Sequence, residues 1–443
     1  MKKILLFVIL VVLVKLDILA QTKQWTLLEC CDYAVAHNIS IKQTDNQRRK
    51  QELSLSTARN SRLPDLSASI GENFSFGRGL TAENTYSNTN TSQTSFSLGT
   101  SVPLFTGFQI PNTIKLNQLN LEAATQDLEK AKNDIRVQVA QAYVKILYDL
   151  EICDVARRQI TIDSLQVYRL QVMLNNGKAS QAELSQQQAT LAQSHLTATQ
   201  ADNDLQLDIL ALTQLLELPS PEGFSVVRPD LDALLSSLNA QLVSPDLIYQ
   251  EALTARPEVA AEQLRLQGTE NSIKIAQSAL YPSLSFSAGL GTNYYKTSGF
   301  TADGFGNQLK NNFSQYLGVN LQIPIFNRFS TRNNIRSARI DQETQQLQLD
   351  NVKKTLYKEI QQVYYNAVAA SEKLRSSQQA MLAARDAFTL MQAKYENGKA
   401  NITEFDDAKN KYLKAESDLV QARYEYLYQS HLLDFYRGRQ LSF

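Results

Sequence analysis

Two long stretches of the chain repeat apolar residues at every third or fourth position and contain no proline. Steps of three and four residues place such side chains on one face of a helix. The chain has no proline between residues 112 and 218 or after residue 327. Each stretch therefore predicts a helix of about 65 residues, about 100 Å long at 1.5 Å per residue. The apolar positions are Leu128, Ala131, Ile135, Val139, Ala142 and Ile146, and, 221 residues later, Leu349, Val352, Leu356, Ile360, Val363 and Ala367.

Each predicted helix ends in the same four residues. Asn176-Gly177-Lys178-Ala179 recurs as Asn397-Gly398-Lys399-Ala400. Glycine adopts the left-handed conformation that ends a helix, and asparagine suits the same turn. Returning helices are predicted from about Ser180 to Leu218 and from about Thr403 to Arg437, so the chain should contain two long hairpins.

Between the proline-containing segments the apolar period falls to two, which indicates strands. Strands are predicted at about residues 65–77, 93–105, 283–296 and 313–326, with loops over 78–92 and 297–312. Each strand has one apolar face and one face of Ser, Gly, Asn and Gln. A sheet with one wet face is one explanation. The near absence of charge from the polar face and the adjoining very long helices favour a membrane barrel.

Four strands cannot close a membrane barrel, which needs about eight or more. Two copies of the chain would give eight strands and three would give twelve, so the pattern requires an oligomer without choosing between them. The proline landmarks also repeat, Pro64 with Pro282 and Pro103 with Pro324. The predicted fold class is therefore α+β with an internal duplication. The first repeat covers 21–218, a linker 219–245, the second repeat 246–437 and a tail 438–443.

The first twenty residues are typical of a signal peptide. Lys2 and Lys3 precede an apolar run from Ile4 to Val14, and a small residue, Ala20, ends the segment. The predicted signal peptide is residues 1–20, which indicates export. The whole chain has 44 Lys and Arg against 44 Asp and Glu. Zero net charge excludes capture of nucleic acid by the whole chain, and a mean hydropathy of −0.30 excludes a polytopic helical membrane protein.

Catalytic chemistry is almost absent from the sequence. The histidines stand in unrelated contexts, and no metalloprotease, nucleophile-elbow or phosphate-loop motif occurs. We therefore expect no enzyme activity, no cofactor and no metal site. The cysteines do not have metal-binding spacing, and buried free thiols explain them better than intermolecular pairing. The residues concerned are His37, His195, His431, Cys30, Cys31 and Cys153.

The ordered set of features resembles the TolC family of outer-membrane efflux and secretion channels. Besides the repeats and turns, three segments carry the resemblance: Trp25-Thr26-Leu27 with Glu29-Cys30, Tyr249 to Leu253 with Arg256-Pro257-Glu258, and Ala422 to Leu427. The resemblance covers about residues 25–437. It implies a homotrimer with a 12-stranded barrel in outer-membrane lipid and a helical tunnel through the periplasm, with residues 219–245 in an equatorial collar.

The resemblance also suggests functional positions at the helix turns. Glu404 and Asp407 match the family's acidic ring at a narrow entrance, and Glu183 is the repeat partner of Glu404. Tyr395 matches a tyrosine of the closing network, whose basic partner aligns with Ala400, beside Lys399. The turns, Asn176, Gly177, Lys178, Asn397, Gly398 and Lys399, would contact an adaptor. Alternatively, the glycines only end helices and the acids only complement helix dipoles.

The predicted function is a passive exit duct. It would join a periplasmic adaptor (membrane fusion) protein and an inner-membrane RND, MFS or ABC pump, in a tripartite efflux or type I secretion system. The alternative is a periplasmic adaptor or another long-hairpin structural protein of the envelope. An adaptor should have one hairpin flanked by compact β domains, whereas this sequence predicts two equivalent hairpins. Drugs, metals, siderophores and proteins all stay open as substrates.

Overall fold

The structure is a computed structural model that describes residues 23–80, 84–237 and 243–441. The predicted signal peptide, residues 1–20, lies outside the described residues, as do parts of the predicted linker and tail. The chain divides into two compact units, which we describe separately. Unit 1 comprises Met1–Asp45, Asp127–Val259 and Val352–Phe443, and unit 2 comprises Asn46–Gln126 and Ala260–Asn351.

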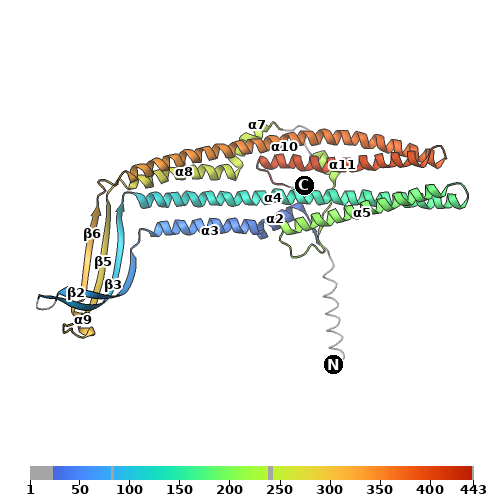
Figure 1. Ribbon diagram of the computed structural model, residues 1–443. Coiled ribbons are helices and arrows are strands. Elements are labelled where there is room, and N and C mark those ends of the chain that lie inside the picture. Colours follow the sequence, from blue (N-terminus) through green and yellow to red (C-terminus); the bar gives the residue numbers. More distant parts are fainter. Residues whose placement is uncertain (1–22, 81–83, 238–242, 442–443) are drawn as a thin grey trace, which may run out of the picture. The chain divides into compact units, whose positions relative to one another are not determined.

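Both long predicted helices are present (Figure 1). Helix α4 (Gln109–Asn175) and helix α10 (Ser330–Glu396) each have 67 residues. Helices α5 (Gln181–Leu215) and α11 (Ile402–Tyr436) return from them, and each has 35 residues. The predicted helical hairpins are thus confirmed. The equal lengths agree with the predicted duplication, which itself stays a prediction.

The predicted apolar face forms part of the core of unit 1. Val139 and Ile146 in α4, and Leu356 and Ile360 in α10, are at most 2% exposed. Removing such side chains from water contributes about 25 cal/mol per Å² of apolar surface. The 3.6-residue period therefore identified the residues that hold the long helices against their neighbours.

Shorter helices begin and end at residues that break the helical pattern. Between α2 (Leu27–His37) and α3 (Ile39–Asn60), the Asn38 side chain donates to the Leu215 carbonyl at 3.1 Å and accepts from the Ser40 N–H at 2.9 Å. Helix α7 (Pro245–Ala255) is followed by α8 (Pro257–Ser278), because Pro257 has no N–H to continue a helix but suits the first position of a new one.

A small parallel sheet in unit 1 joins the start of the described chain to the predicted linker. Strand β1 (Gln24–Trp25) pairs with β4 (Ser225–Val226), and the linker also contains α6 (Leu231–Ser237). The Tyr143 hydroxyl of α4 lies 3.1 Å from the Trp25 carbonyl and 2.8 Å from the Val227 carbonyl. One buried phenol therefore holds both segments against the long helix.

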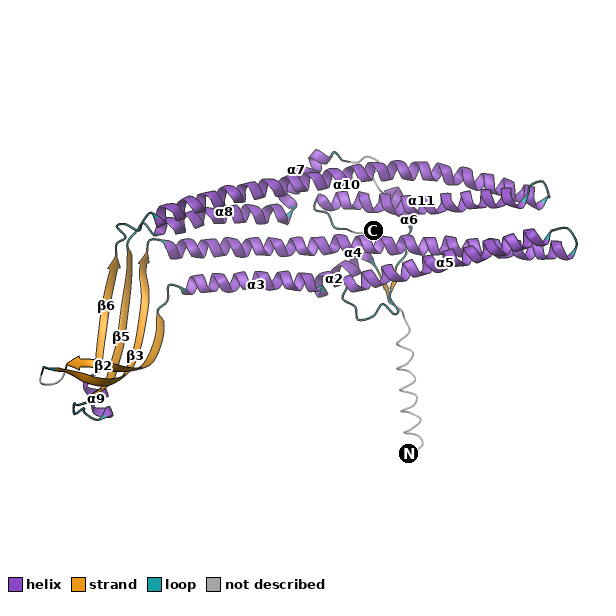
Figure 2. Cartoon of the chain, viewed as in Figure 1, coloured by secondary structure: helices purple, strands orange, loops and turns teal. Residues whose placement is uncertain are grey.

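Unit 2 contains an antiparallel sheet whose order is β2-β3-β5-β6 (Figure 2). The strands are β2 (Asp65–Leu80), β3 (Tyr86–Thr106), β5 (Ser283–Thr297) and β6 (Ser314–Gln322). The central pair, β3 and β5, comes from the two predicted repeats and joins them in one sheet.

Two predicted loops and one strand boundary were wrong in detail. The first loop, predicted over 78–92, is mostly strand, because β2 and β3 continue until Leu80 pairs with Tyr86. Thr and Ser there fit a pleated ladder as well as they fit a loop. In the second loop, α9 (Phe305–Asn311) follows β5. Strand β6 ends at Gln322 rather than 326, because Pro324 cannot donate to a ladder.

Helix α9 covers the C-terminal part of β5, which continues past the point where β6 begins. The side-chain amide of Gln308 accepts from the Tyr295 N–H at 2.9 Å and donates to the Tyr295 carbonyl at 3.0 Å. One glutamine thus substitutes for a strand at this point, which satisfies backbone groups that a short β6 leaves over.

The predicted apolar face of the sheet is open in the single chain. Leu66, Ile70 and Phe74 in β2 are 61–74% exposed, and Leu317 and Val319 in β6 are 79% and 65% exposed. A contiguous apolar face of this kind indicates contact with lipid or with another protein. Among the described helices, none is both long and apolar enough to cross a membrane.

Candidate functional site

The two helix turns have the same backbone geometry and lie at the same end of unit 1 (Figure 1). Gly177 and Gly398 both have φ of +70°. The N–H of Lys178 donates to the Met173 carbonyl at 2.8 Å, and the N–H of Lys399 donates to the Lys394 carbonyl at 2.8 Å. These are the 6→1 hydrogen bonds of a Schellman motif, which needs a residue in the left-handed conformation.

The asparagine before each glycine completes the turn. Asn176 Nδ2 donates to the Val172 carbonyl and Asn397 Nδ2 to the Ala393 carbonyl, both at 2.7 Å. Each of these carbonyls also accepts from the backbone N–H of the same asparagine at 3.2 Å, so the side chain adds a second hydrogen bond to the last turn. The repeated Asn-Gly pair is explained by helix termination, and its six exposed turn residues remain available to a partner.

The predicted gate acids Glu183 and Glu404 both belong to capping boxes. Glu183 accepts from the Ser180 N–H at 2.7 Å, and its own N–H donates to the Ser180 hydroxyl at 3.2 Å. Glu404 accepts from the Asn401 N–H at 3.0 Å and donates in return to Asn401 Oδ1 at 2.9 Å. The backbone bond from Ser180, followed by its hydroxyl bond, holds the pKa of Glu183 below its usual value. Both carboxylates therefore help to cap the N-terminus of a helix, whatever further role they have.

Asp407 lies one turn after Glu404 on the same helix. Its carboxylate pairs with Lys411 at 2.7 Å, and the two side chains are 62% and 71% exposed. Glu404 and Asp407 are both exposed in the single chain. The spacing of three residues puts them on one side of α11, as the sequence predicted.

Tyr395 belongs to an aromatic cluster that joins α10 to α11. Its ring stacks on Phe405 with 4.9 Å between centroids, and Phe405 is 1% exposed. Phe388 contacts Phe405 at 5.7 Å and stacks on Tyr412 at 5.5 Å. Burial raises the pKa of Tyr395. These ring contacts place the tyrosine inside the second hairpin.

Sequence reasoning missed a buried polar cluster that connects the two hairpins. Asp163 of α4 pairs with Lys409 of α11, and both side chains are fully buried. Gln187 and Ser194 of α5 donate to the same carboxylate at 3.3 and 2.5 Å. The two charged residues are 246 positions apart, so no local pattern in the sequence could pair them.

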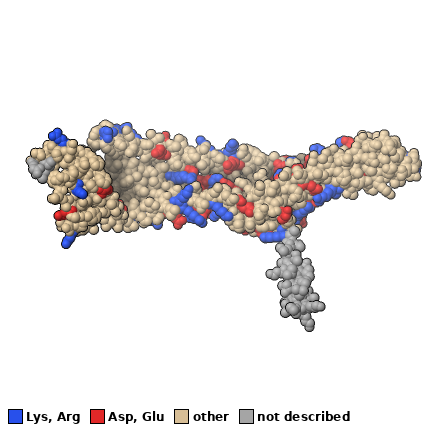
Figure 3. All heavy atoms as spheres, turned by 60° about the horizontal axis from the view of Figure 1, so that its bottom comes forward, with Lys and Arg blue, Asp and Glu red and all other residues tan. Residues whose placement is uncertain are grey.

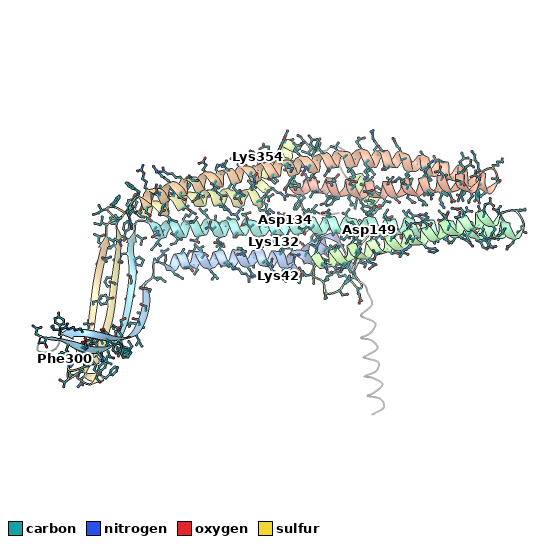
Figure 4. The ribbon with its side chains drawn as sticks, viewed as in Figure 1. Lys42, Lys132, Asp134, Asp149, Phe300 and Lys354 are labelled. Atoms are coloured by element: carbon teal, nitrogen blue, oxygen red, sulfur yellow. The ribbon has the colours of Figure 1, made fainter. Side chains whose placement is uncertain are left out.

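A second cluster that the sequence did not indicate lies between α4 and α5. Asp149, labelled in Figure 4, is 7% exposed and lies beside Asp208 of α5. Burial, followed by a hydrogen bond to Asp208, raises the pKa of Asp149 to about 7. Lys145 pairs with Asp208 and lies 3.7 Å from Asp149. Its positive charge opposes the rise without cancelling it.

The thiols are buried and free at all three predicted positions. Burial raises the pKa of Cys30 and of Cys31 to about 12, so neither thiol ionises at neutral pH. Within the described residues, His, Cys, Asp and Glu form no group of three that could hold a metal ion.

Charged residues are unevenly distributed on the face drawn in Figure 3. Lys, Arg, Asp and Glu gather over the middle of the helical part, and few charged atoms appear at the end that holds the two turns. The first turn segment, residues 171–185, is rich in Asn, Gln, Ser and Ala and carries two charged residues, Lys178 and Glu183. The second, residues 392–407, carries six, so Lys399 has several charged neighbours in the sequence and Lys178 has few.

Comparison with known proteins relates this geometry to one family. The family model for outer membrane efflux proteins matches residues 31–217 and 248–439. The outer membrane efflux protein BepC of Brucella suis is 21% identical over 92% of this chain and 84% of its own length. The outer membrane protein TolC of Vibrio cholerae is 21% identical over 72% of each chain. A solved structure of CusC, 18% identical, covers 95% of this chain and 96% of its own with a TM-score of 0.77.

Proposed function

This chain belongs to the outer membrane efflux protein family, and on that premise we propose that it is the passive outer-membrane exit duct of a tripartite efflux or type I secretion system. The observation that supports this proposal most directly is the four-stranded sheet. Within the described residues its outer strands, β2 and β6, each pair on one side only, and its apolar face is open. Open strand edges are not tolerated in lipid, so other copies of the chain must cover them.

We propose a homotrimer. Four strands from each of three copies give a closed barrel of twelve, within the range that bacterial barrels adopt. The apolar face then meets outer-membrane lipid, and the face of Ser, Gly, Asn and Gln lines a wet channel. The helical hairpins continue the duct through the periplasm. The internal duplication provides two equivalent hairpins in each copy, and the signal peptide exports the chain.

Transport energy comes from a partner in this proposal. A periplasmic adaptor protein contacts the turns through Asn176, Gly177, Lys178, Asn397, Gly398 and Lys399, and an inner-membrane RND, MFS or ABC pump drives the substrate. The matching geometry and exposure of the two turns support their role as the contact surface. Replacing Lys178 and Lys399 with Glu keeps both glycines, so it should weaken adaptor binding without breaking the turns. Unchanged adaptor binding by surface plasmon resonance would remove this assignment.

The acidic gate is a second element of the proposal. Three copies place Glu404 and Asp407 in rings of like charge around the narrow entrance, with Glu183 and Tyr395 nearby. Such rings attract cations. The exposure of both carboxylates supports this, and the capping role of Glu404 does not exclude it, since a capping carboxylate retains acceptor capacity toward the pore.

Charge can be tested separately from helix capping. Glutamine also serves at the third position of a capping box, so Glu404→Gln removes the charge and keeps the cap. Glu404→Gln and Asp407→Asn together should weaken block of planar-bilayer conductance by multivalent cations. Asp418→Asn, on the same helix and 51% exposed beside Lys414, is the control. Equal block of conductance in wild type and double variant would refute the assignment of an acidic ring.

The assembly itself has a direct test. Detergent extraction of outer membranes should yield a protein whose mass by light scattering is that of three chains, and it should conduct in planar bilayers. A monodisperse soluble monomer would refute the duct.

A further inference from the structure

The outer part of β5 continues beyond the strand that ends the sheet. Strand β5 has 15 residues and β6 has nine. Their pairing stops where Gly291 meets Ser314, so Thr292 to Thr297 of β5 have no strand on that side. This extension lies at the end of the sheet remote from the long helices (Figure 2). It leaves an edge of backbone N–H and C=O groups that β6 does not satisfy.

Helix α9 covers this edge of β5 with amide side chains. Gln308 bonds both the N–H and the carbonyl of Tyr295, at 2.9 and 3.0 Å. Asn312, just after the helix, donates from Nδ2 to the Asn293 carbonyl at 2.8 Å. The chain therefore satisfies the outer edge of β5 by itself, with a helix in the place of a strand.

The outer part of β2 has no comparable cover. Within the described residues β2 pairs with β3 alone and ends the sheet on the other side. In the proposed barrel its free edge meets β6 of the next copy. Strand β2 has 16 residues against nine in β6, so at least seven residues of β2 stay unpaired. If the inner ends of the two strands, Asp65 and Gln322, are level, the unpaired residues are Phe74 to Leu80.

This outer segment of β2 is apolar on one face. Phe74, Phe76 and Leu80 are 61%, 74% and 49% exposed, and alternate residues of a strand share a face. A strand edge that combines free backbone groups with exposed aromatic side chains tends to recruit another element. Across the seam of a closed barrel, the element at this level is α9 of the next copy, because α9 occupies the place that β6 does not reach.

Helix α9 has a second polar side that matches such an edge. Gln308 faces β5 and is half-buried, whereas Asn307 and Asn311 are exposed. The two asparagines are four residues apart and therefore share one side of the helix. Their side chains carry the same amide group, donor and acceptor together, that Gln308 uses on the backbone of Tyr295.

Aromatic side chains at the two ends of α9 add an apolar match. Phe305 is 49% exposed and Phe313 is 56% exposed. The ring of Phe305 already contacts Tyr294 of β5, with 5.2 Å between centroids. Tyr294 pairs with Thr94, which pairs with Glu72, so it lies on the same face of the sheet as Phe74 and Phe76.

We propose that α9 of each copy seals the outer part of the seam to the next copy. Gln308 holds β5 of its own chain, while Asn307 and Asn311 bond the outer edge of β2 in the next copy. This inference rests on the proposed homotrimer, and it supplies a contact for which β6 is too short. A second copy is the occupant because the contact continues the seam between β2 and β6 that closes the barrel.

Cross-linking between copies tests this contact directly. Phe76→Cys in β2 and Asn307→Cys in α9 place two thiols on the two sides of the seam. Within one chain β3 and β5 lie between these positions, so a short bis-maleimide joins two copies. Treated outer membranes should give bands of two and three chains on a denaturing gel. Each single-cysteine variant should give one chain, because the natural thiols are buried.

A second cysteine pair reports on the trimer independently of α9. Ser67→Cys and Asn320→Cys lie in the inner parts of β2 and β6 and should link copies in any closed barrel. If this pair links and the α9 pair does not, the seal is refuted and the barrel stands. If neither pair links, the homotrimer itself fails. A band that contains a different protein would show that another partner takes the edge of β2, which also refutes the seal.

Hydrogen exchange tests the same contact without cysteines. In the wild-type trimer the amides of residues 74–80 that point away from β3 should be protected. Asn307→Ala together with Asn311→Ala should speed their exchange about tenfold, which corresponds to one hydrogen bond of about 1.4 kcal/mol. Asp303→Ala, at an exposed position just before α9, is the control and should change nothing. Unprotected amides in wild type, or equal exchange in wild type and double variant, would overturn the proposal.

Discussion

Asp149 provides the sharpest test of the electrostatics of the helical hairpins. Its side chain is almost fully buried between α4 and α5, beside the Asp208 carboxylate, and its pKa is raised to about 7. In an unfolded chain the same carboxyl group ionises near its ordinary pKa of 3.8. The folded state therefore holds a proton that the unfolded state has released throughout the interval from pH 3.8 to about pH 7.

The sign follows from proton linkage. Where the native state binds more protons than the unfolded state, stability falls as pH rises. The slope is about 1.4 kcal/mol per pH unit, so the whole interval corresponds to about 4 kcal/mol. Solvent reaches the cluster beside Lys145, which is 56% exposed, and its screening lowers our expectation to about 2–3 kcal/mol. The loss should be complete above about pH 7 and absent below pH 3.8.

Asp149→Asn removes this titration while keeping the shape of the protonated acid. The variant and wild type should be nearly equal in stability at pH 4.5, and the variant should be more stable at pH 8.5. At about 2 cal/mol/K of unfolding entropy per residue, a chain of 443 residues should gain about 2–3 °C in Tm. Circular dichroism at both pH values in the same detergent measures this.

Asp134→Asn is the matched control, because Asp134 lies on the same helix with its side chain 51% exposed beside Lys130 (Figure 4). A Tm difference between Asp149→Asn and wild type that stays the same at pH 4.5 and pH 8.5 would refute the raised pKa. So would a difference that favours wild type at high pH.

Three further predictions concern the turns and the core. Gly398→Ala should destabilise the protein by about 1 kcal/mol, because an L residue is strained at φ of +70°. The control Gly304→Ala should not destabilise it, because Gly304 has open space around it and φ of −59°. Equal Tm values for the two variants would contradict the turn geometry. Phe405→Ala should cost about 3–5 kcal/mol through the cavity it leaves, and a urea midpoint equal to that of wild type would show that the aromatic cluster does not form. Tyr143→Phe should speed hydrogen exchange at the Val227 amide, which donates to the Trp25 carbonyl, and exchange that does not change would exclude the phenol as the group that holds β1 and β4 against α4.

The long helices and the strands could be predicted from the sequence because their signals are local. A stretch of apolar residues at 3.6-residue spacing without proline has few other ways to bury its apolar face. Proline also marks where the regular strand pairing changes, since Pro103 lies beside the register shift of β3. The prediction failed where local chemistry is ambiguous. Asn, Thr and Ser between residues 84 and 92 suit a loop or a ladder, and only cross-strand pairing decides between them.

The candidate site shows the same division. The turns at Gly177 and Gly398 and the capping acids could be predicted, because each motif is complete within six residues. The Asp163–Lys409 pair and the Asp149–Asp208 pair could not, because their partners come from different helices and meet only after those helices pack. A lysine such as Lys409 looks like a residue of a solvated helix face until its neighbours are known.

The pairing of β3 with β5 has a consequence for how the protein is made. Thr91 pairs with Thr297, so the central ladder needs residues about 200 positions apart in the sequence. Closing so long a loop is slow, and it cannot begin until the second half has been synthesised. Until then the hairpin of β2 and β3 has an unpaired edge and a bare apolar face, which is the kind of surface that aggregates. We therefore expect the newly made chain to depend on holding chaperones during its passage to the membrane.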